Sequence, residues 1–143
     1  MKVKDLLAVK GRAVATISQE RSVTDALALL KERRIGALIV TGPTPPLVGI
    51  FSERDVVRAL ASHGAEALDL TVAELMSTEI TVCDETTSVT SLMGMMTEHR
   101  IRHIPVVTDG LLVGMVSIGD VVKARFDELE HDKKDLLDYV SAR

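Results

Sequence analysis

The chain has 143 residues, the size of one compact domain, and its 17 basic and 21 acidic residues give a net charge of −4. Such a charge provides no long-range attraction toward a nucleic-acid backbone or an anionic membrane, so neither is expected as a partner. The single cysteine, Cys83, excludes an internal disulfide. Because the sequence has neither a signal segment nor an apolar run of about 18 residues, it predicts a soluble cytoplasmic protein.

The first half of the chain predicts a mixed α/β unit. Residues 3–9 form a short amphipathic turn and residues 13–17 a short strand, after which Ser22 begins a helix that ends near residue 33. Strands follow at 37–40 and 47–51, separated by a loop with three prolines. A second helix starts after Ser52 and ends near Gly64, a residue type that suits the end of a helix.

The second half repeats this order of elements. After a connector at 65–70, residues 71–74 have the pattern of a capping box, and a strand at 80–82, a helix at 88–99 and strands at 104–107 and 111–116 follow. The last helix begins at Asp120 and continues to about Val140. Gly114 follows Gly49 by 65 residues, and the fixed period indicates a duplicated unit whose two copies share one core.

The clearest feature of the duplication is a seven-residue phrase with the pattern Gly, two apolar residues, Ser, two variable residues and Asp. It occupies residues 49–55 and 114–120, in each case where an apolar strand is expected to give way to a helix. Free amides at the start of a helix favour an anion such as phosphate, and a short carboxylate accepts hydrogen bonds from a ribose diol. The phrase therefore predicts two sites for a phosphorylated sugar.

The same residues also have a simpler interpretation as helix caps. A Ser oxygen at the start of a helix accepts a hydrogen bond from an amide two or three residues later. Ser22 and Asp25 have the same spacing without the preceding glycine and apolar strand, so the spacing alone is a weak signal. The glycine, the strand and the duplication are what favour binding over capping alone.

The duplicated unit resembles a tandem pair of CBS domains, named for cystathionine beta-synthase. The resemblance is carried by Gly-Ile-Phe-Ser-Glu-Arg-Asp at 49–55, Ile-Arg-His-Ile-Pro-Val-Val at 101–107 and Gly-Met-Val-Ser-Ile-Gly-Asp at 114–120, and it covers nearly the whole chain. It implies an α/β fold of two β-α-β-β-α repeats related by a pseudo-twofold axis. The expected boundaries are 1–64 for the first repeat, 65–70 for the connector, 71–126 for the second repeat and 127–143 for a helical extension.

The resemblance also implies ligands and positions. The ligands are adenosine compounds such as AMP, ADP, ATP, NAD, NADH or S-adenosylmethionine, and the assembly is a flat homodimer. Asp55 and Asp120 would hold ribose hydroxyls, while Ser52 and Ser117 would touch phosphate or ribose. Backbone around the adenine would come from four further positions: Thr16, Ile17, Ile80 and Val82.

The two expected sites differ in charge. Arg102 and His103 stand just before a strand of the second repeat, where members of the family often place basic side chains on phosphate, whereas the aligned position in the first repeat is the uncharged Gly36. The first phrase instead carries Arg54, where the second has Gly119. A guanidinium group binds phosphate through two parallel hydrogen bonds, so ligands of different charge are expected in the two sites.

No residue pattern in the sequence indicates a catalytic residue, a catalytic cofactor or a metal site. The expected function is therefore regulatory: the module binds an adenosine nucleotide and changes its conformation or its affinity for a partner outside this chain. Two alternatives stay open. One is a nucleotide-processing enzyme using Asp55, Asp120 or His103, and the other is a structural dimerisation module that uses the long terminal helix without any ligand.

Overall fold

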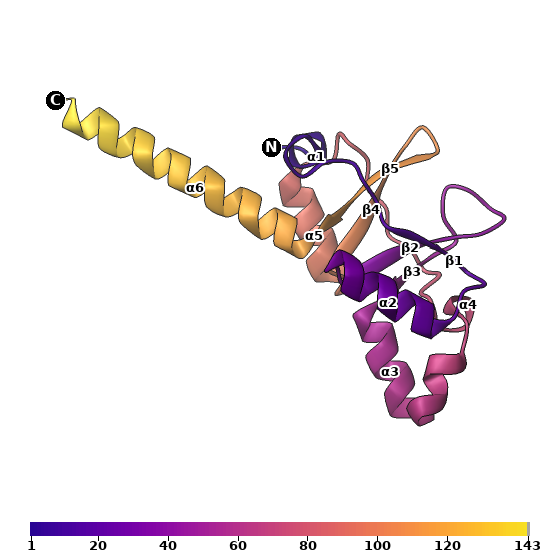
Figure 1. The fold of residues 1–143 in the computed structure, drawn as a ribbon. Helices are drawn as coiled ribbons and strands as arrows, with labels where there is room; N and C mark the ends of the chain where they lie inside the picture. The colour runs from indigo at the N-terminus through magenta and orange to yellow at the C-terminus, as the bar shows by residue number, and fades with distance from the viewer. Residues whose placement is uncertain (143) are drawn as a thin grey trace.

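The computed structural model describes residues 1–142, and its first half forms a three-stranded sheet with two helices (Figure 1). The elements are β1 (Thr16–Ser18), α2 (Val23–Arg33), β2 (Ala37–Thr41), β3 (Gly49–Ser52) and α3 (Glu53–His63). Strand β2 lies in the middle, parallel to β1 and antiparallel to β3. It is the apolar run Ala37–Val40 that takes this central position, with all four residues buried.

The second half has the same order of elements around a smaller sheet. It contains α5 (Val89–His99), the antiparallel pair β4 (His103–Thr108) and β5 (Leu111–Ser117), and α6 (Ile118–Ser141). The strand expected at 80–82 is wrong, because only Cys83 makes a bridge, to Val106 of β4. Just upstream, Ser77 still pairs with Ile50 of the first sheet, so the chain crosses from one sheet to the other along the residues expected to form the strand.

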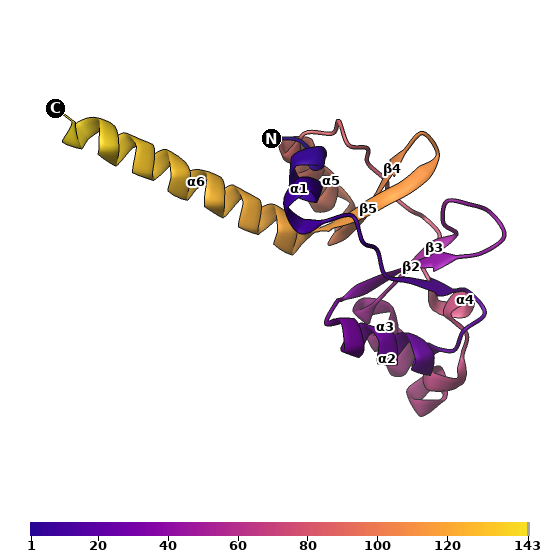
Figure 2. The same ribbon diagram turned by 45° about the horizontal axis from the view of Figure 1, so that its top comes forward.

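Each half has its own aliphatic core, and each core receives a helix from the other half. Helix α1 (Val3–Lys10), expected only as a turn, packs Val3, Leu6 and Leu7 into the core of the second half. The short helix α4 (Val72–Leu75) packs into the first core together with residues from the end of the 3-10 helix η1 (Gly64–Asp69). Figure 2 shows α1 beside α5, far along the chain from it. The predicted α/β fold of two related units is confirmed.

The glycine that opens each phrase is explained by this exchange. A Cβ at Gly49 would lie 2.6 Å from the sulfur of Met76, which follows α4. A Cβ at Gly114 would lie 2.8 Å from a methyl carbon of Leu7 in α1. Both distances are too short for any side chain, so these glycines let the exchanged helices approach the strands that lead into the two phrases.

Helix α6 differs from the other helices in its length and its surroundings. It has 24 residues, begins at Ile118 rather than at the expected Asp120, and projects away from the body in both views (Figures 1 and 2). From Leu129 to residue 142 every residue is exposed. Among the helices of residues 1–142, none combines the length and apolar character that a bilayer span requires.

Candidate functional site

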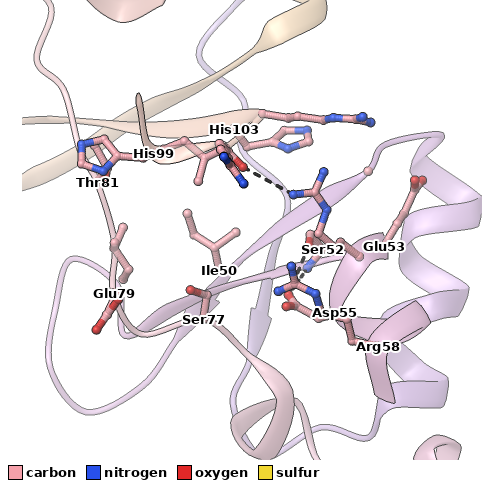
Figure 3. A pocket seen from close by; sticks show the side chains of 16 residues that line it. Ile50, Ser52, Glu53, Asp55, Arg58, Ser77, Glu79, Thr81, His99 and His103 are labelled. Atoms are coloured by element: carbon pink, nitrogen blue, oxygen red, sulfur yellow. Dashed lines mark hydrogen bonds between the residues drawn. The ribbon is translucent and has the colours of Figure 1, made fainter. Parts of the chain in front are cut away.

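A cleft of about 580 Å³ lies between the two halves, and its walls come from both of them. We call it the first cleft. The first half contributes the end of β3 and the first turns of α3, and the second half contributes residues 77–81 and the turn at 99–103 that joins α5 to β4. Its volume lies in the range of sites for small ligands. In Figure 3, Asp55 and Arg58 lie on the α3 side, with Glu79 and Thr81 across from them.

The first phrase forms the α3 end of this cleft. One carboxylate oxygen of Asp55, Oδ2, accepts hydrogen bonds from the backbone amide of Ser52 at 2.8 Å and from its hydroxyl at 3.2 Å. This is a capping box, so the capping interpretation of the phrase describes the geometry correctly. Because both bonds converge on Oδ2, the second oxygen of Asp55 is left to accept a bond from a ligand. Burial raises the pKa of Asp55 despite these bonds and the nearby Arg58 and Arg54.

Four arginines line the first cleft: Arg54, Arg58, Arg100 and Arg102. Arg54 donates a long hydrogen bond of 3.4 Å to the carbonyl of Arg100, which has a left-handed backbone (φ 54°) at the end of α5. In the part of the chain that the structure describes, the five ion pairs involve none of these four guanidinium groups. Together with the amides at the start of α3, they make a cleft suited to an anion.

The second phrase has the same capping geometry but a different neighbour. Asp120 Oδ2 accepts from the Ser117 amide at 2.8 Å, and Ser117 Oγ accepts from the Asp120 amide at 3.2 Å. The ammonium group of Lys10 donates to the same Asp120 oxygen at 2.6 Å and to the carbonyl of Met115 at 2.7 Å. Lys10 therefore pairs with Asp120 through the same oxygen that caps α6, and any group approaching this carboxylate meets the ammonium group.

The two aspartates consequently differ in their electrostatics. Burial would raise the pKa of Asp120, but the hydrogen bond from Lys10, the bonds from Ser117 and the charge of Lys10 together lower it. Asp55 has no such ion pair, and its pKa is raised. Within the described residues the Asp55 carboxylate thus makes no ion pair, while the Asp120 carboxylate is already neutralised by Lys10.

The presence of Lys10 follows from a difference in length between the two exchanged helices. Leu7 and Met76 hold equivalent positions, each against the glycine of a phrase. Helix α4 ends just before Met76, whereas α1 continues for almost one more turn after Leu7 and carries Lys10 at its end. The extra turn brings the lysine to the second phrase.

The structure groups the expected site residues differently from the sequence alignment. The sequence assigned Arg102 and His103 to the second phrase, but their side chains line the first cleft, where they join Arg54. The Arg102 carbonyl also accepts from the Ile118 amide at the start of α6, and His103 lies opposite Ser117 in the β4–β5 pair, so both residues also lie near the second phrase. The grouping differs because the site forms across the two halves, whereas an alignment compares positions within each half.

The remaining expected residues fall into two groups. Those that line the first cleft include Ser52, Asp55, Ile80 and Gly36. Those outside it are Ser117, Gly119, Asp120, Thr16, Ile17 and Val82. Ile17 is buried in the first core, and Val82 is exposed.

Several cleft residues went unnoticed in the sequence, namely Arg58, Ser77, Glu79, Thr81, His99 and Arg100. Of these, only Arg58 had a signal, its place one turn after the first phrase.

His103 is one of two histidines that line the first cleft, together with His99. Burial lowers the pKa of His103, and the positive charges of Lys10 and Arg102 lower it too, while the negative charges of Asp120 and Glu53 act to raise it.

The described residues contain no group of three or more His, Cys, Asp or Glu that could hold a metal ion. Cys83 is buried, and desolvation followed by the charge of Asp84 raises its pKa to about 11, which makes it a poor nucleophile.

Comparison with known proteins gives consistent results along almost the whole chain. The family model described as "CBS domain" matches residues 3–62 and 72–127. The chain is 35% identical over 147 residues to the mitochondrial CBS domain-containing protein CBSX3 of Arabidopsis thaliana, covering 96% of this chain and 71% of that protein. It is 31% identical over 119 residues to YhcV of Bacillus subtilis, covering 83% of this chain and 81% of that protein.

Solved structures have the same fold. The CBS-domain containing protein ATU1752 from Agrobacterium tumefaciens is 44% identical, with a TM-score of 0.84 over 87% of this chain and 92% of that one. The CBS domain pair of MJ0100, solved in complex with 5'-methylthioadenosine and S-adenosyl-L-methionine, is 26% identical, with a TM-score of 0.79 over 90% of this chain and 98% of that one.

Proposed function

Since this chain belongs to the CBS-domain family, we propose that it is a regulatory module that binds one phosphorylated adenosine ligand per chain, in the first cleft. The observation that carries the proposal is the set of four arginines that line the cleft beside a half-buried Asp55 and take part in no ion pair among the described residues. An uncharged nucleoside would not neutralise these guanidinium groups. A nucleotide such as AMP, ADP, ATP or NAD supplies both the ribose diol and the phosphate oxygens.

Each part of the ligand has a matching group in the cleft. The free oxygen of Asp55 accepts from the ribose hydroxyls, and the arginines with the start of α3 bind the phosphate. The apolar side chains Ile50, Ile80 and Ile101 provide a surface for the adenine ring. The complex of MJ0100 with two adenosine derivatives supports an adenosine-containing ligand, and the phosphate is inferred from the arginines of this chain.

The second phrase is proposed to hold no ligand in the wild-type protein, because the ammonium group of Lys10 already pairs with Asp120 there.

Binding of a ligand in the first cleft alone gives a simple route to regulation. The ligand touches α3 of the first half and residues 77–81 and 99–103 of the second, so it stabilises the arrangement in which these segments are close. Any alternative arrangement with a lower affinity for the ligand loses population when the ligand binds.

Isothermal titration with AMP, ADP, ATP, NAD and adenosine tests the proposal. We expect one site per chain and a clear preference for phosphorylated ligands over adenosine. Asp55→Ala should abolish binding, while the matched control Asp25→Ala, at the same position of a capped helix outside the cleft, should bind normally. Equal binding by the Asp55 variant and the wild type would contradict the ribose assignment, and product analysis after incubation with ATP or NAD checks for turnover.

A further inference from the structure

The outer face of α6 carries a continuous apolar seam. Its members recur at alternating intervals of four and three residues: Val122, Phe126, Leu129, Lys133, Leu136 and Val140. The five apolar side chains among them are 60–67% exposed. An apolar repeat every 3.5 residues is the pattern of helices that wind around one another.

This seam faces away from the body of the protein. Val121 is buried in the core of the second half, and Ala124 packs against the same core, so they hold α6 by its opposite side. Beyond Leu129 the helix has no buried residue at all. A helical segment of about 13 residues that buries none of its apolar side chains is marginal in water, since most helical stability in proteins comes from burying an apolar face.

We propose that this seam binds the same seam of a second copy of the chain, forming a parallel two-stranded coiled coil. The inference stands on α6 alone and does not depend on the ligand proposed above. Lys133 is the one polar member of the seam, and a single lysine at such a position fixes the register and the number of strands at some cost in stability.

Charge complementarity favours the parallel orientation. Arg125 immediately precedes the seam residue Phe126, and Glu130 immediately follows the seam residue Leu129. In a parallel pair, a residue in the first of these positions lies opposite the residue five positions later on the other helix. Arg125 of each copy therefore lies opposite Glu130 of the other, which gives two such pairs per dimer. Lys133 then lies beside Asp132 of the second copy. An antiparallel pair that matches Val122 with Val140 instead brings the two Glu130 side chains together, and like charges at that distance repel.

The ion pairs already present on α6 leave this arrangement possible. His131 and Asp135 pair at 3.2 Å on the side of the helix away from the seam. Arg125 pairs with Glu128 at 3.2 Å, with both side chains well exposed. An exposed pair of this kind contributes little, so Arg125 can exchange Glu128 for Glu130 of the second copy without a large loss.

Cysteine crosslinking tests the seam and its orientation together. In a parallel pair Leu136 faces its own copy, so oxidised Leu136→Cys should form a covalent dimer, whereas the neighbouring control Asp135→Cys, on the outer side, should not. Cys83 is buried and does not interfere. Equal crosslinking of the two variants, or none by Leu136→Cys, would overturn the proposal. Crosslinking that requires Phe126→Cys together with Leu136→Cys would show an antiparallel pair and overturn the orientation.

Analytical ultracentrifugation supplies a second measurement that does not depend on oxidation. Leu129→Glu removes an apolar contact from each helix and should raise the dissociation constant of the dimer by at least about tenfold. Its ligand titration should equal that of the wild type, which separates a failure of this inference from a failure of the nucleotide proposal. Self-association unchanged in Leu129→Glu would overturn the coiled coil. Binding of the protein to anionic vesicles through α6, with no dimer in solution, would also overturn the coiled coil.

Discussion

Removing the Lys10 side chain should turn the second phrase into a ligand site. In Lys10→Ala the ammonium group that binds Asp120 and the Met115 carbonyl is absent, so the Asp120 carboxylate loses its counter-charge and the space beside it opens to ribose hydroxyls. The side chains of Lys10 and Asp120 are 32% and 24% exposed, so their ion pair is partly screened by solvent. Charge-assisted bonds of this exposure are worth about 1–2 kcal/mol together.

That energy sets the size of the expected effect. A ligand entering the second phrase of the wild type has to displace Lys10, which lowers its affinity there by about 5–30-fold relative to Lys10→Ala. Isothermal titration with AMP should therefore change from one binding event per chain in the wild type to two in the variant. The same substitution should also destabilise the protein by about 1 kcal/mol in urea unfolding, because the ion pair is lost.

Controls on the same helix and the same phrase make the result specific. Lys4→Ala, which removes an exposed lysine from α1, should keep one binding event, and Lys10→Ala combined with Asp120→Ala should return to one. Two equal binding events in the wild type would refute the role of Lys10, and so would a single event in Lys10→Ala. Absence of any binding by the wild type would instead refute the nucleotide proposal itself.

Three further predictions concern the cleft and its support. Arg102→Ala should weaken AMP by about 10–100-fold in titrations but leave adenosine nearly unchanged, and equal losses would contradict a phosphate role. Gly49→Ala should lower the unfolding free energy by about 1–3 kcal/mol in urea, because its Cβ would also lie 2.9 Å from the Ser77 carbonyl oxygen; an unchanged midpoint would refute the close approach. The lowered pKa of His103 means that the unfolded chain binds more protons near pH 6, so stability should fall as the pH drops through about 6.5. His103→Gln should flatten that part of the curve, and an identical slope would contradict it.

Much of the fold was predictable because its signals are local. Apolar periodicity located α2, α3, α5, β2 and β5 to within a few residues. The strand at 80–82 was wrong because its residues cross between the two sheets, and no local pattern records which neighbour is available for pairing. Helix α1 was underestimated for a similar reason, since its apolar side is completed by core residues between 76 and 118 positions away along the chain.

The residues that line the first cleft were less predictable from the sequence than the Ser-x-x-Asp phrase at its centre. Asp55 and Ser52 were found because the phrase is duplicated, but the arginines of the first cleft come from segments almost 50 residues apart. Aligning the two halves placed Arg102 with the second phrase and did not indicate that it also lines the first cleft, because alignment compares equivalent positions and the cleft joins non-equivalent ones. Lys10 had no signal at all, as its position depends on the length of α1 and on the approach of α1 to β5.

The sequence by itself determined that two related units are present, that each carries a Ser-x-x-Asp phrase able to cap a helix, and that the chain resembles CBS domains. These properties follow from periodicity and from hydrogen bonds between residues three positions apart, which a short stretch of chain specifies. Only the tertiary structure decided that one phrase faces a cleft lined by arginines while the other is neutralised by Lys10. That difference arises from the packing of each half against the other, and the relevant contacts join residues about 50 to 110 positions apart.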